Sequence, residues 1–182
     1  MSLIPGGCVL WLTGLSGSGK TTLARQLDLW LKSRGIHPVM LDGDAIRDLL
    51  LEPAGHDRAT RLRIARFNAR LCRFLSSQGL TVICPTISMF NEIQSWNRDN
   101  IPGYIEIFLD APIDVVRARD PKGIYHRFER GEASEVVGLD IQAEFPQSPD
   151  IRLPMDRHIS IESSFATLTS LLNGHLYGRN HS

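Results

Sequence analysis

The stretch Gly14-Leu-Ser-Gly-Ser-Gly-Lys-Thr21 decides the fold, because it fills every fixed position of the pattern Gly-x-x-x-x-Gly-Lys-Thr. The apolar run Cys8-Val-Leu-Trp-Leu-Thr13 precedes it and is typical of a buried strand, and residues 22–31 place apolar side chains at helical spacing. A strand, a glycine loop and a helix in this order indicate a phosphate-binding loop. The alternative, a glycine-rich turn that binds nothing, does not account for the complete pattern in this context.

Each residue type in the loop has a physical role. Glycines let the backbone turn its N–H groups inward toward phosphate oxygens, and the following helix adds its positive N-terminal end. Lys20 is a mobile charge for the β- and γ-phosphates, and the Thr21 hydroxyl can hold Mg²⁺. We therefore expect ATP with Mg²⁺ as the cofactor, bound by Gly14, Ser16, Gly17, Ser18, Gly19, Lys20, Thr21 and Thr22.

Composition limits the class of protein. The chain has 182 residues, enough for one domain, and its 20 basic and 20 acidic residues give a net charge of zero. A neutral chain is not built for non-specific nucleic-acid binding. No apolar run reaches transmembrane length, and no charged leader precedes the first apolar stretch. Cys8, Cys72 and Cys84 lack metal-ligand spacing, so we expect buried free thiols and a cytoplasmic protein without membrane contact.

Strand and helix patterns alternate along the chain. Strands are expected at 8–13, 36–41, 80–84, 104–109 and 158–161, and helices at 22–31, 45–51, 58–77 with Asp57 as its cap, 91–100, 113–118 and 165–172. This predicts an α/β fold of the P-loop NTPase type: a three-layer sandwich with a central parallel sheet and helices on both faces. We expect residues 1–182 to form a single domain, in which residues 120–150 lose periodicity and act as a lid over the substrate.

Two carboxylates follow the second expected strand, in Leu41-Asp-Gly-Asp44. In a parallel sheet this end of the strand faces the ligand crevice. Phosphoryl transfer needs Mg²⁺ near the transferred phosphate and a carboxylate that orients and deprotonates the acceptor hydroxyl, and Asp42 and Asp44 can divide these roles. A solvated Asp-Gly turn is the alternative, and it is the better reading only outside a phosphate-loop protein.

Positive charge is expected around the same crevice. Arg47 lies one helical turn after Asp44, and Arg58 and Arg61 begin the long helix, where they can bind a second phosphate-bearing ligand. Arg63 and Arg66 are interpreted as its solvated face. Ser88 follows the third strand at the ligand edge. The lid is basic, with Arg119, Lys122, His126, Arg127 and Arg130 in or beside it, and His126 is interpreted as a surface residue.

The chain resembles the adenylylsulfate kinase (APS kinase) family from about Val9 to Leu153. The resemblance is carried by the loop motif at 14–24, by residues 41–47, by His56-Asp-Arg58, by Ile87-Ser88, by residues 108–115, by Arg119-Asp-Pro-Lys-Gly-Ile-Tyr125 and by Val137-Gly-Leu-Asp140. The first motif is common to many phosphate-loop proteins, whereas the Asp-Gly-Asp and Asp-Pro-Lys-Gly elements are much more specific. The family transfers the γ-phosphate of MgATP to the 3′-hydroxyl of adenylyl sulfate, and its members are commonly dimers.

The resemblance implies a role for each matching residue. The loop and the segment with Arg119 and Lys122 bind ATP. Asp44 and Lys20 are catalytic, and Asp42 is the metal-side partner that holds Mg²⁺ with Thr21. The acceptor nucleotide is contacted by Asp44, Arg47, Arg58, Arg61, Ile87, Ser88, Lys122 and Leu139.

The departures from the family pattern concentrate at the acceptor. The family has Gly-Phe-Ser before its Asp-Arg pair and Phe-Thr-Gly-Ile-Asp in its lid, where this chain has Ala54-Gly-His56 and Val136-Val-Gly-Leu-Asp140. The missing phenylalanines are those that stack on the acceptor's adenine, a contact worth about 1–3 kcal/mol per base in nucleic-acid sites. Arg61 stands where the family has Asn, and Met89 replaces a Pro. Phe90 or Trp96 can supply another ring, although packing is the simpler reading of either.

These departures leave the acceptor open. The segment Thr86 to Arg98, with Val136-Val-Gly-Leu-Asp140, resembles a branch of the family, the cytidine diphosphoramidate kinases of capsular polysaccharide modification. Adenylyl sulfate, in sulfate activation, is the nearest match. A non-catalytic nucleotide-binding regulator is the alternative of another class. A guanine-specific switch is disfavoured, because the chain has no Asn-Lys-x-Asp element.

Overall fold

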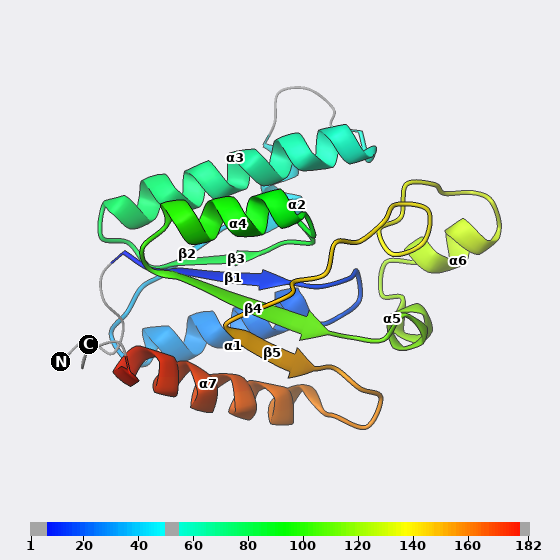
Figure 1. Ribbon diagram of the computed structural model, residues 1–182. Coiled ribbons are helices and arrows are strands. Elements are labelled where there is room, and N and C mark those ends of the chain that lie inside the picture. The colour runs from blue at the N-terminus through cyan, green and yellow to red at the C-terminus, as the bar shows by residue number, and fades with distance from the viewer. Residues whose placement is uncertain (1–6, 50–54, 179–182) are drawn as a thin grey trace.

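A five-stranded parallel sheet forms the centre of the computed structural model, which describes residues 7–49 and 55–178 (Figure 1). Its strands lie in the order β2-β3-β1-β4-β5. Their bounds are β1 Val9–Thr13, β2 Val39–Met40, β3 Val82–Pro85, β4 Tyr104–Asp110 and β5 Ile151–Pro154. The strand before the glycine loop is therefore central, and the loop emerges at the middle of the sheet's C-terminal edge.

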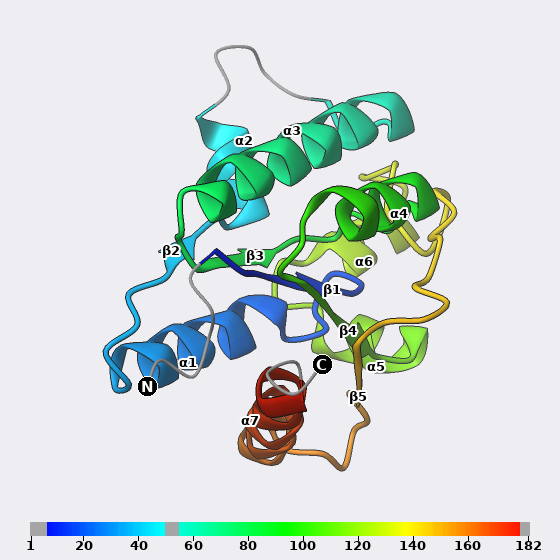
Figure 2. The ribbon, with the colours of Figure 1, turned by 60° about the vertical axis from the view of Figure 1, so that its left-hand side comes forward.

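Helices cover both faces of this sheet. α1 (Lys20–Lys32) and α7 (Ile161–Gly178) lie on one face, and α3 (Arg58–Ser77) and α4 (Asn91–Asn100) lie on the other (Figures 1 and 2). The short helices α2 (Gly43–Asp48), α5 (Ile113–Arg119) and α6 (Ile124–Glu129) lie in the connections that follow β2 and β4. The predicted three-layer α/β sandwich is confirmed.

The alternation of side chains along β1 creates two cores. Leu10 and Leu12 pack with Leu23 and Leu27 of α1 on one face of the sheet. Val9 and Trp11 belong to a second cluster on the other face, which includes Ala65, Ala69 and Cys72 of α3. All five residues of β1 are buried, as a central strand of a parallel sheet requires. The phosphate-binding loop is therefore anchored on the most deeply buried strand.

The long helix α3 has the predicted bounds. Asp57 precedes it with extended backbone, and its Oδ1 accepts a hydrogen bond from the Thr60 N–H at 2.9 Å. β3 and β4 end one residue later than predicted and β2 is limited to two residues. α2 begins two residues earlier than predicted, and its predicted end falls partly outside the described residues.

The prediction of a fifth strand at 158–161 is wrong. The strand lies at Ile151–Pro154, where Ile151 pairs with Ile107 and Leu153 pairs with Leu109 of β4. Ile151 and Leu153 are buried, while Arg152 and Pro154 are exposed, so the burial alternates. Ser160 precedes α7, and its Oγ accepts a hydrogen bond from the Ser163 N–H at 3.2 Å. The polar residue in the expected strand therefore starts a helix, which begins four residues before the predicted one.

The 120–150 segment is mostly irregular and contains α6. Its turn is held by the Asp140 carboxylate, which accepts from the N–H groups of Glu135 at 2.7 Å and Val136 at 2.6 Å. The Tyr125 hydroxyl donates to the Ser16 carbonyl at 3.0 Å, so α6 is bound directly to the glycine loop. The segment thus lies beside the C-terminal edge of the sheet (Figure 1).

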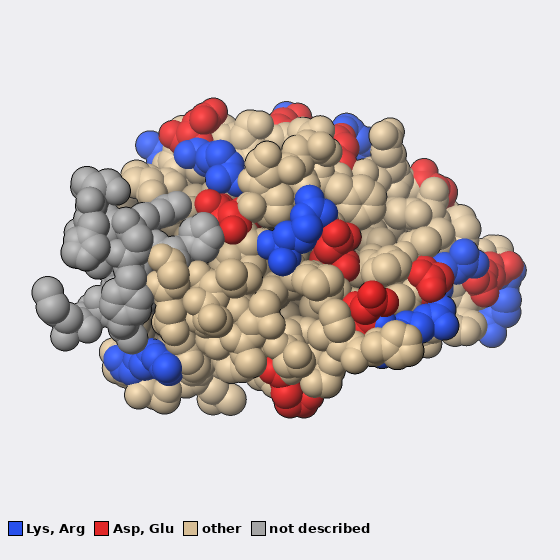
Figure 3. Space-filling model, turned by 60° about the horizontal axis from the view of Figure 1, so that its bottom comes forward, with Lys and Arg blue, Asp and Glu red and all other residues tan. Residues whose placement is uncertain are grey.

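Charges on the underside of the molecule, shown in Figure 3, are interspersed. Blue and red side chains lie next to one another in this view. Arg157 and Asp114, at 2.8 Å, form one of the ion pairs of the structure. Positive and negative side chains are thus mixed on this face, in keeping with the net charge of zero. Among the described residues, no helix combines the length and the apolar character that crossing a membrane requires.

Candidate active site

The glycine loop between β1 and α1 has the backbone that its sequence predicts. Gly17 and Gly19 adopt φ values of 76° and 99°, a region that favours glycine, and Gly19 directly precedes the first residue of α1. At Gly14 a side chain would meet the Leu109 carbonyl and Ser18 Oγ at 2.8 Å each. Glycine is therefore required both for the turn and for its close contact with β4.

Lys20 is folded back onto the loop. It is buried, and its Nζ donates to the carbonyls of Gly14 at 2.8 Å and Leu15 at 2.7 Å. Burial, followed by the nearby charge of Lys122, lowers the pKa of Lys20 to about 7, whereas Asp44 and Asp42 act in the opposite direction. An anionic group placed beside this lysine would raise its pKa again.

Asp42 and Asp44 lie at the start of α2. Asp42 caps the helix, and its Oδ1 accepts from the Asp44 N–H at 2.9 Å. Its Oδ2 lies 3.5 Å from the Thr21 hydroxyl of α1. A side chain at Gly43 would meet Thr86 Oγ1 at 3.2 Å, so the glycine between the acids lets α2 approach the end of β3.

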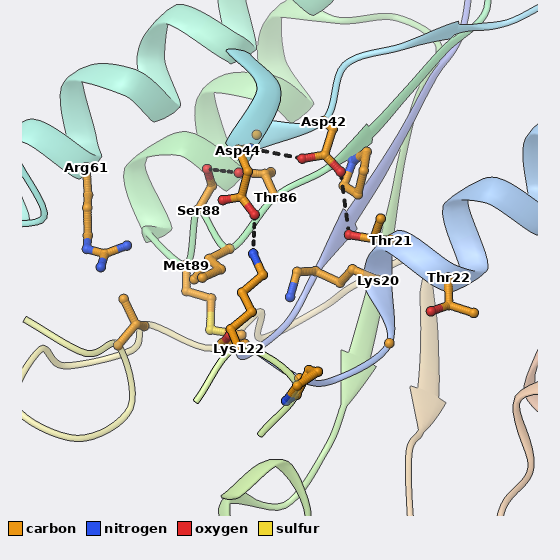
Figure 4. Close-up of a pocket in the computed structure, with 18 of the residues that line it drawn as sticks. Lys20, Thr21, Thr22, Asp42, Asp44, Arg61, Thr86, Ser88, Met89 and Lys122 are labelled. Atoms are coloured by element: carbon orange, nitrogen blue, oxygen red, sulfur yellow. Dashed lines mark hydrogen bonds and ion pairs between the residues drawn. The ribbon is translucent and has the colours of Figure 1, made fainter. Parts of the chain in front are cut away.

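The hydroxyl and carboxylate of Thr21 and Asp42 suit a magnesium ion. Mg²⁺ prefers oxygen ligands and retains several of its waters, so it needs only one or two protein ligands beside substrate phosphates. Both oxygens lie at the mouth of the glycine loop, on the side where α2 begins (Figure 4). The residues present therefore fit the ion that the sequence predicts.

Lys122 reaches Asp44 from the opposite side of the site. Its ammonium group contacts the Asp44 carboxylate, as the dashed line in Figure 4 shows. Both side chains are more than half exposed, so the pair is solvated and contributes little to stability. The contact nevertheless places the basic 120–150 segment directly opposite the acid of α2.

One cavity of about 890 Å³ joins these groups. The predicted site residues that line it are Ser16, Gly17, Gly19, Lys20, Thr21, Thr22, Asp42, Asp44, Arg47, Arg61, Ile87, Ser88, Arg119 and Lys122. Gly14 and Ser18 belong to the loop beneath this surface. The cavity is large enough for a nucleotide and lies at the C-terminal ends of β1, β2 and β3.

Two of the predicted acceptor residues do not line this cavity. Arg58 pairs with Glu144 at 2.7 Å, and its guanidinium lies 5.3 Å from the centre of the Phe90 ring. Leu139 lines a neighbouring hollow with Asp110 and other residues of the β4–α5 connection. Both side chains are thus held beside the cavity in this structure.

Arg61, unlike Arg58, lies at the cavity as the sequence predicts. It lines the cavity and donates to the carbonyls of His56 at 2.6 Å and Glu135 at 2.8 Å. Burial lowers the pKa of Arg61, and the charge of Arg47 adds to the shift. Arg61 therefore joins the start of α3 to the 120–150 segment at the cavity wall.

Several lining residues had no signal in the sequence. They are Arg25, Ile64, Asn68, Ile141, Gln142, Met155, Ile159 and Ile161. Phe90, one of two rings considered as a substitute clamp, lines the cavity but is only 4% exposed. Trp96, the other, packs against the core beneath α3.

A phosphate-binding loop at the end of the central strand and a carboxylate facing it across one cavity define a P-loop phosphotransferase. The family model for adenylylsulphate kinase matches residues 6–154. The chain therefore belongs to the adenylylsulphate kinase family, whose members are phosphotransferases that act on a hydroxyl group.

Individual relatives agree with this assignment. An adenylyl-sulfate kinase of Marinobacter nauticus is 40% identical over 148 residues, which cover 80% of this chain and 74% of that protein. A cytidine diphosphoramidate kinase of Campylobacter jejuni is 41% identical over 140 residues, covering 77% and 82%. The APS kinase of Mycobacterium tuberculosis, solved in complex with AMPPNP and APS, matches with a TM-score of 0.83 and 33% identity, covering 92% of this chain and 98% of that one.

Proposed function

We propose that this protein transfers the γ-phosphate of ATP to the 3′-hydroxyl of adenylyl sulfate. The observation that carries the proposal is the common cavity, in which the glycine loop with Lys20 and the carboxylate of Asp44 face each other. Space for both a triphosphate and a sugar hydroxyl between these groups is what in-line phosphoryl transfer requires. The complex of the M. tuberculosis relative with AMPPNP and APS supports this choice of donor and acceptor.

The donor half consists of the loop and its neighbours. Backbone N–H groups of residues 14–22 bind the phosphates, and Lys20 turns from the loop carbonyls toward the β- and γ-phosphates. Arg119 and Lys122 supply further positive charge from the opposite wall. Thr21 and Asp42 hold Mg²⁺, which neutralises charge on the phosphate oxygens when it is bound.

The acceptor half begins at Asp44. Its carboxylate orients the acceptor hydroxyl and takes up its proton as the oxygen attacks phosphorus. Arg47, Arg61 and Lys122 bind the anionic group of the acceptor, and Ile87 and Ser88 contact it from the end of β3. Arg58 and Leu139 join this set when the 120–150 segment closes as a lid, which requires Arg58 to exchange Glu144 for the acceptor.

A second candidate acceptor is cytidine diphosphoramidate, and a specific observation favours it. The relative from C. jejuni with that name is as similar to this chain as the adenylyl-sulfate kinase of M. nauticus. Moreover, Val136 stands where the family has the phenylalanine that stacks on adenine, and its neighbour Val137 lines the cavity. A smaller base needs less of this stacking surface.

The remaining proposals concern the setting of the enzyme. Cys72 and Cys84 are buried free thiols and Cys8 is buried as well, which supports a reducing compartment such as the cytoplasm. A homodimer is proposed from the family resemblance alone. One domain spanning residues 1–182 is proposed because the described residues form one sheet with helices on both faces.

The test is a coupled assay of ADP release by the purified protein with ATP, Mg²⁺ and each acceptor in turn. We expect turnover with adenylyl sulfate and a product phosphorylated at the 3′-hydroxyl, identified by mass spectrometry and phosphorus NMR. Turnover with the cytidine compound alone would transfer the proposal to the second candidate. ATP binding without turnover of either acceptor would contradict a kinase and favour a regulator.

A further inference from the structure

Asn68 is a polar side chain in an apolar part of the cavity wall. It lies in the third turn of α3 and is 1% exposed. Neither its Oδ1 nor its Nδ2 has a hydrogen-bond partner among the described residues. It nevertheless lines the cavity that contains Asp44 and the glycine loop.

An unpartnered amide at such a place is costly. Buried polar side chains in folded proteins are nearly always hydrogen-bonded, because leaving one unpaired forfeits its hydration without compensation. A leucine of similar size would pack against Ala65 and Ala69, the neighbours of Asn68 on α3, without that cost. The amide therefore calls for a partner that enters through the cavity.

The surroundings of Asn68 indicate the shape of this partner. Ile64, one turn earlier on α3, lines the cavity together with Met89 and Phe90 from the β3–α4 connection. All three are largely buried, at 6%, 2% and 4% exposure. The charged side chains Asp44 and Lys122 meet where the phosphates and the reacting hydroxyl belong (Figure 4), and Arg47 lines the same cavity. The apolar part is left for a flat ring that carries a polar edge.

We propose that Asn68 recognises the base of the acceptor nucleotide. Its Oδ1 accepts a hydrogen bond from an exocyclic amine, and its Nδ2 donates to the adjacent ring nitrogen, the pairing by which asparagine reads adenine elsewhere. The last torsion angle of asparagine is soft, so the amide plane can turn to meet the ring. The acceptor is therefore a nucleotide whose base carries an amino group next to a ring nitrogen, as adenine and cytosine both do. This inference rests on the proposed kinase function.

The same contact explains how the site can lack the family's aromatic pair. Stacking holds a base by its faces and tolerates any edge, whereas an amide in the cavity wall holds it by its edge. Recognition of the base by its edge needs few contacts, but its strength depends on the exocyclic amine of the base. The chain thus exchanges stacking surface for a directional hydrogen bond.

The experiment is a double-mutant cycle between the protein and its acceptor. Wild-type protein, Asn68→Leu and Asn68→Ala are assayed with the intact acceptor and with an analogue in which the exocyclic amine is replaced by hydrogen, using the adenine and the cytosine compounds. In the wild type we expect loss of the amine to lower kcat/KM by about 10-fold, the value of one buried hydrogen bond. In the variants the same loss should change kcat/KM less than about 2-fold.

Controls separate this role from a structural one. Asn97→Leu serves as the matched control, because Asn97 is a buried asparagine on α4 that does not line the cavity. We expect it to keep the wild-type dependence on the amine, and the KM for ATP to be unchanged in both Asn68 variants. If the Asn68 variants lose the same fraction of kcat/KM on the intact acceptor and on the analogue without the amine, Asn68 does not recognise the base. The same conclusion follows if the variants lose no activity on either compound. If the wild type phosphorylates neither acceptor, the proposed function falls, and this inference falls with it.

Discussion

Lys122 contacts the carboxylate of Asp44 although 78 residues separate them in the sequence. The contact joins the 120–150 segment to α2 across the cavity (Figure 4). In the proposed mechanism an acceptor hydroxyl takes the place of the ammonium group before Asp44 receives its proton. Lys122 then turns toward the phosphates and neutralises their charge, so the same lysine serves the acid and the phosphates in turn.

Removing the charge of Asp44 tests its role. We expect Asp44→Asn to lower kcat by about 10²- to 10⁴-fold, because an amide cannot take the acceptor proton. The KM for ATP should change little, since the loop is untouched. Initial rates of ADP release measure both quantities. Asp48→Asn, on the same helix but outside the cavity, is the control and should keep wild-type rates. A fully active Asp44→Asn enzyme would exclude Asp44 as the base.

Lys20 predicts that ATP binding takes up protons. Its pKa is lowered to about 7, so at pH 8 most of the lysine is neutral. Triphosphate oxygens beside it raise the pKa again, and we expect uptake of about one proton per ATP. Calorimetric titration at pH 8 in buffers of different ionisation enthalpy measures this number. The uptake should vanish in Lys20→Met and persist in Lys32→Met, which alters an exposed residue at the end of α1. If both variants take up the same number of protons per ATP, a group other than Lys20 binds the proton.

Arg61 and Arg63 are predicted to differ although they lie two residues apart. Arg61 lines the cavity, whereas Arg63 is exposed on the outer face of α3. We expect Arg61→Gln to raise the KM of the acceptor by about 10- to 100-fold, the range for a lost charged hydrogen bond. Arg63→Gln should leave it unchanged. Steady-state kinetics at saturating ATP decide the matter, and thermal melts establish that both variants are folded. Equal effects would mean that only the summed charge of α3 matters.

Glu106 predicts the pH dependence of stability. Its side chain is 2% exposed, and burial raises its pKa above the ordinary value of 4.5, although Arg98 at 3.0 Å opposes the shift. The folded state therefore binds more protons than the unfolded state above pH 4.5, so the free energy of unfolding falls as the pH rises through the folded pKa. Urea unfolding from pH 4.5 to 7.5 should show this slope in the wild type and in Glu92→Gln, an exposed control. Glu106→Gln should lack it, and parallel curves for all three proteins would contradict the assignment.

Local patterns with a strong chemical requirement were predictable from the sequence. The loop at 14–21 needs glycine at fixed positions, and Asp57 caps α3 because few residue types can accept the free N–H groups there. Asp42 and Asp44 line the cavity as predicted. The C-terminal ends of parallel strands all lie at one edge of the sheet, so residues that follow β2 lie at the same edge as the glycine loop.

Features that depend on tertiary context were not predictable. Both Ile151-Arg-Leu and Ile159-Ser-Ile alternate, and only pairing with β4 distinguishes the strand from the start of a helix. Arg58 and Arg61 lie on adjacent turns of one helix, and Glu144, far along the chain, draws Arg58 away. Nothing in the sequence distinguishes Asn68 from an ordinary surface polar residue, and only its burial in the structure does so.

The strand order separates the proposed binding regions of the two substrates. β1 lies between β3 and β4. In the proposed mechanism the donor therefore binds the loop after β1 and the segments after β4 and β5, while the acceptor binds at α3 and the ends of β2 and β3. Under this proposal the loop that binds ATP can stay the same while the acceptor side of the cavity changes. Relatives with one fold can then phosphorylate different hydroxyl-bearing substrates.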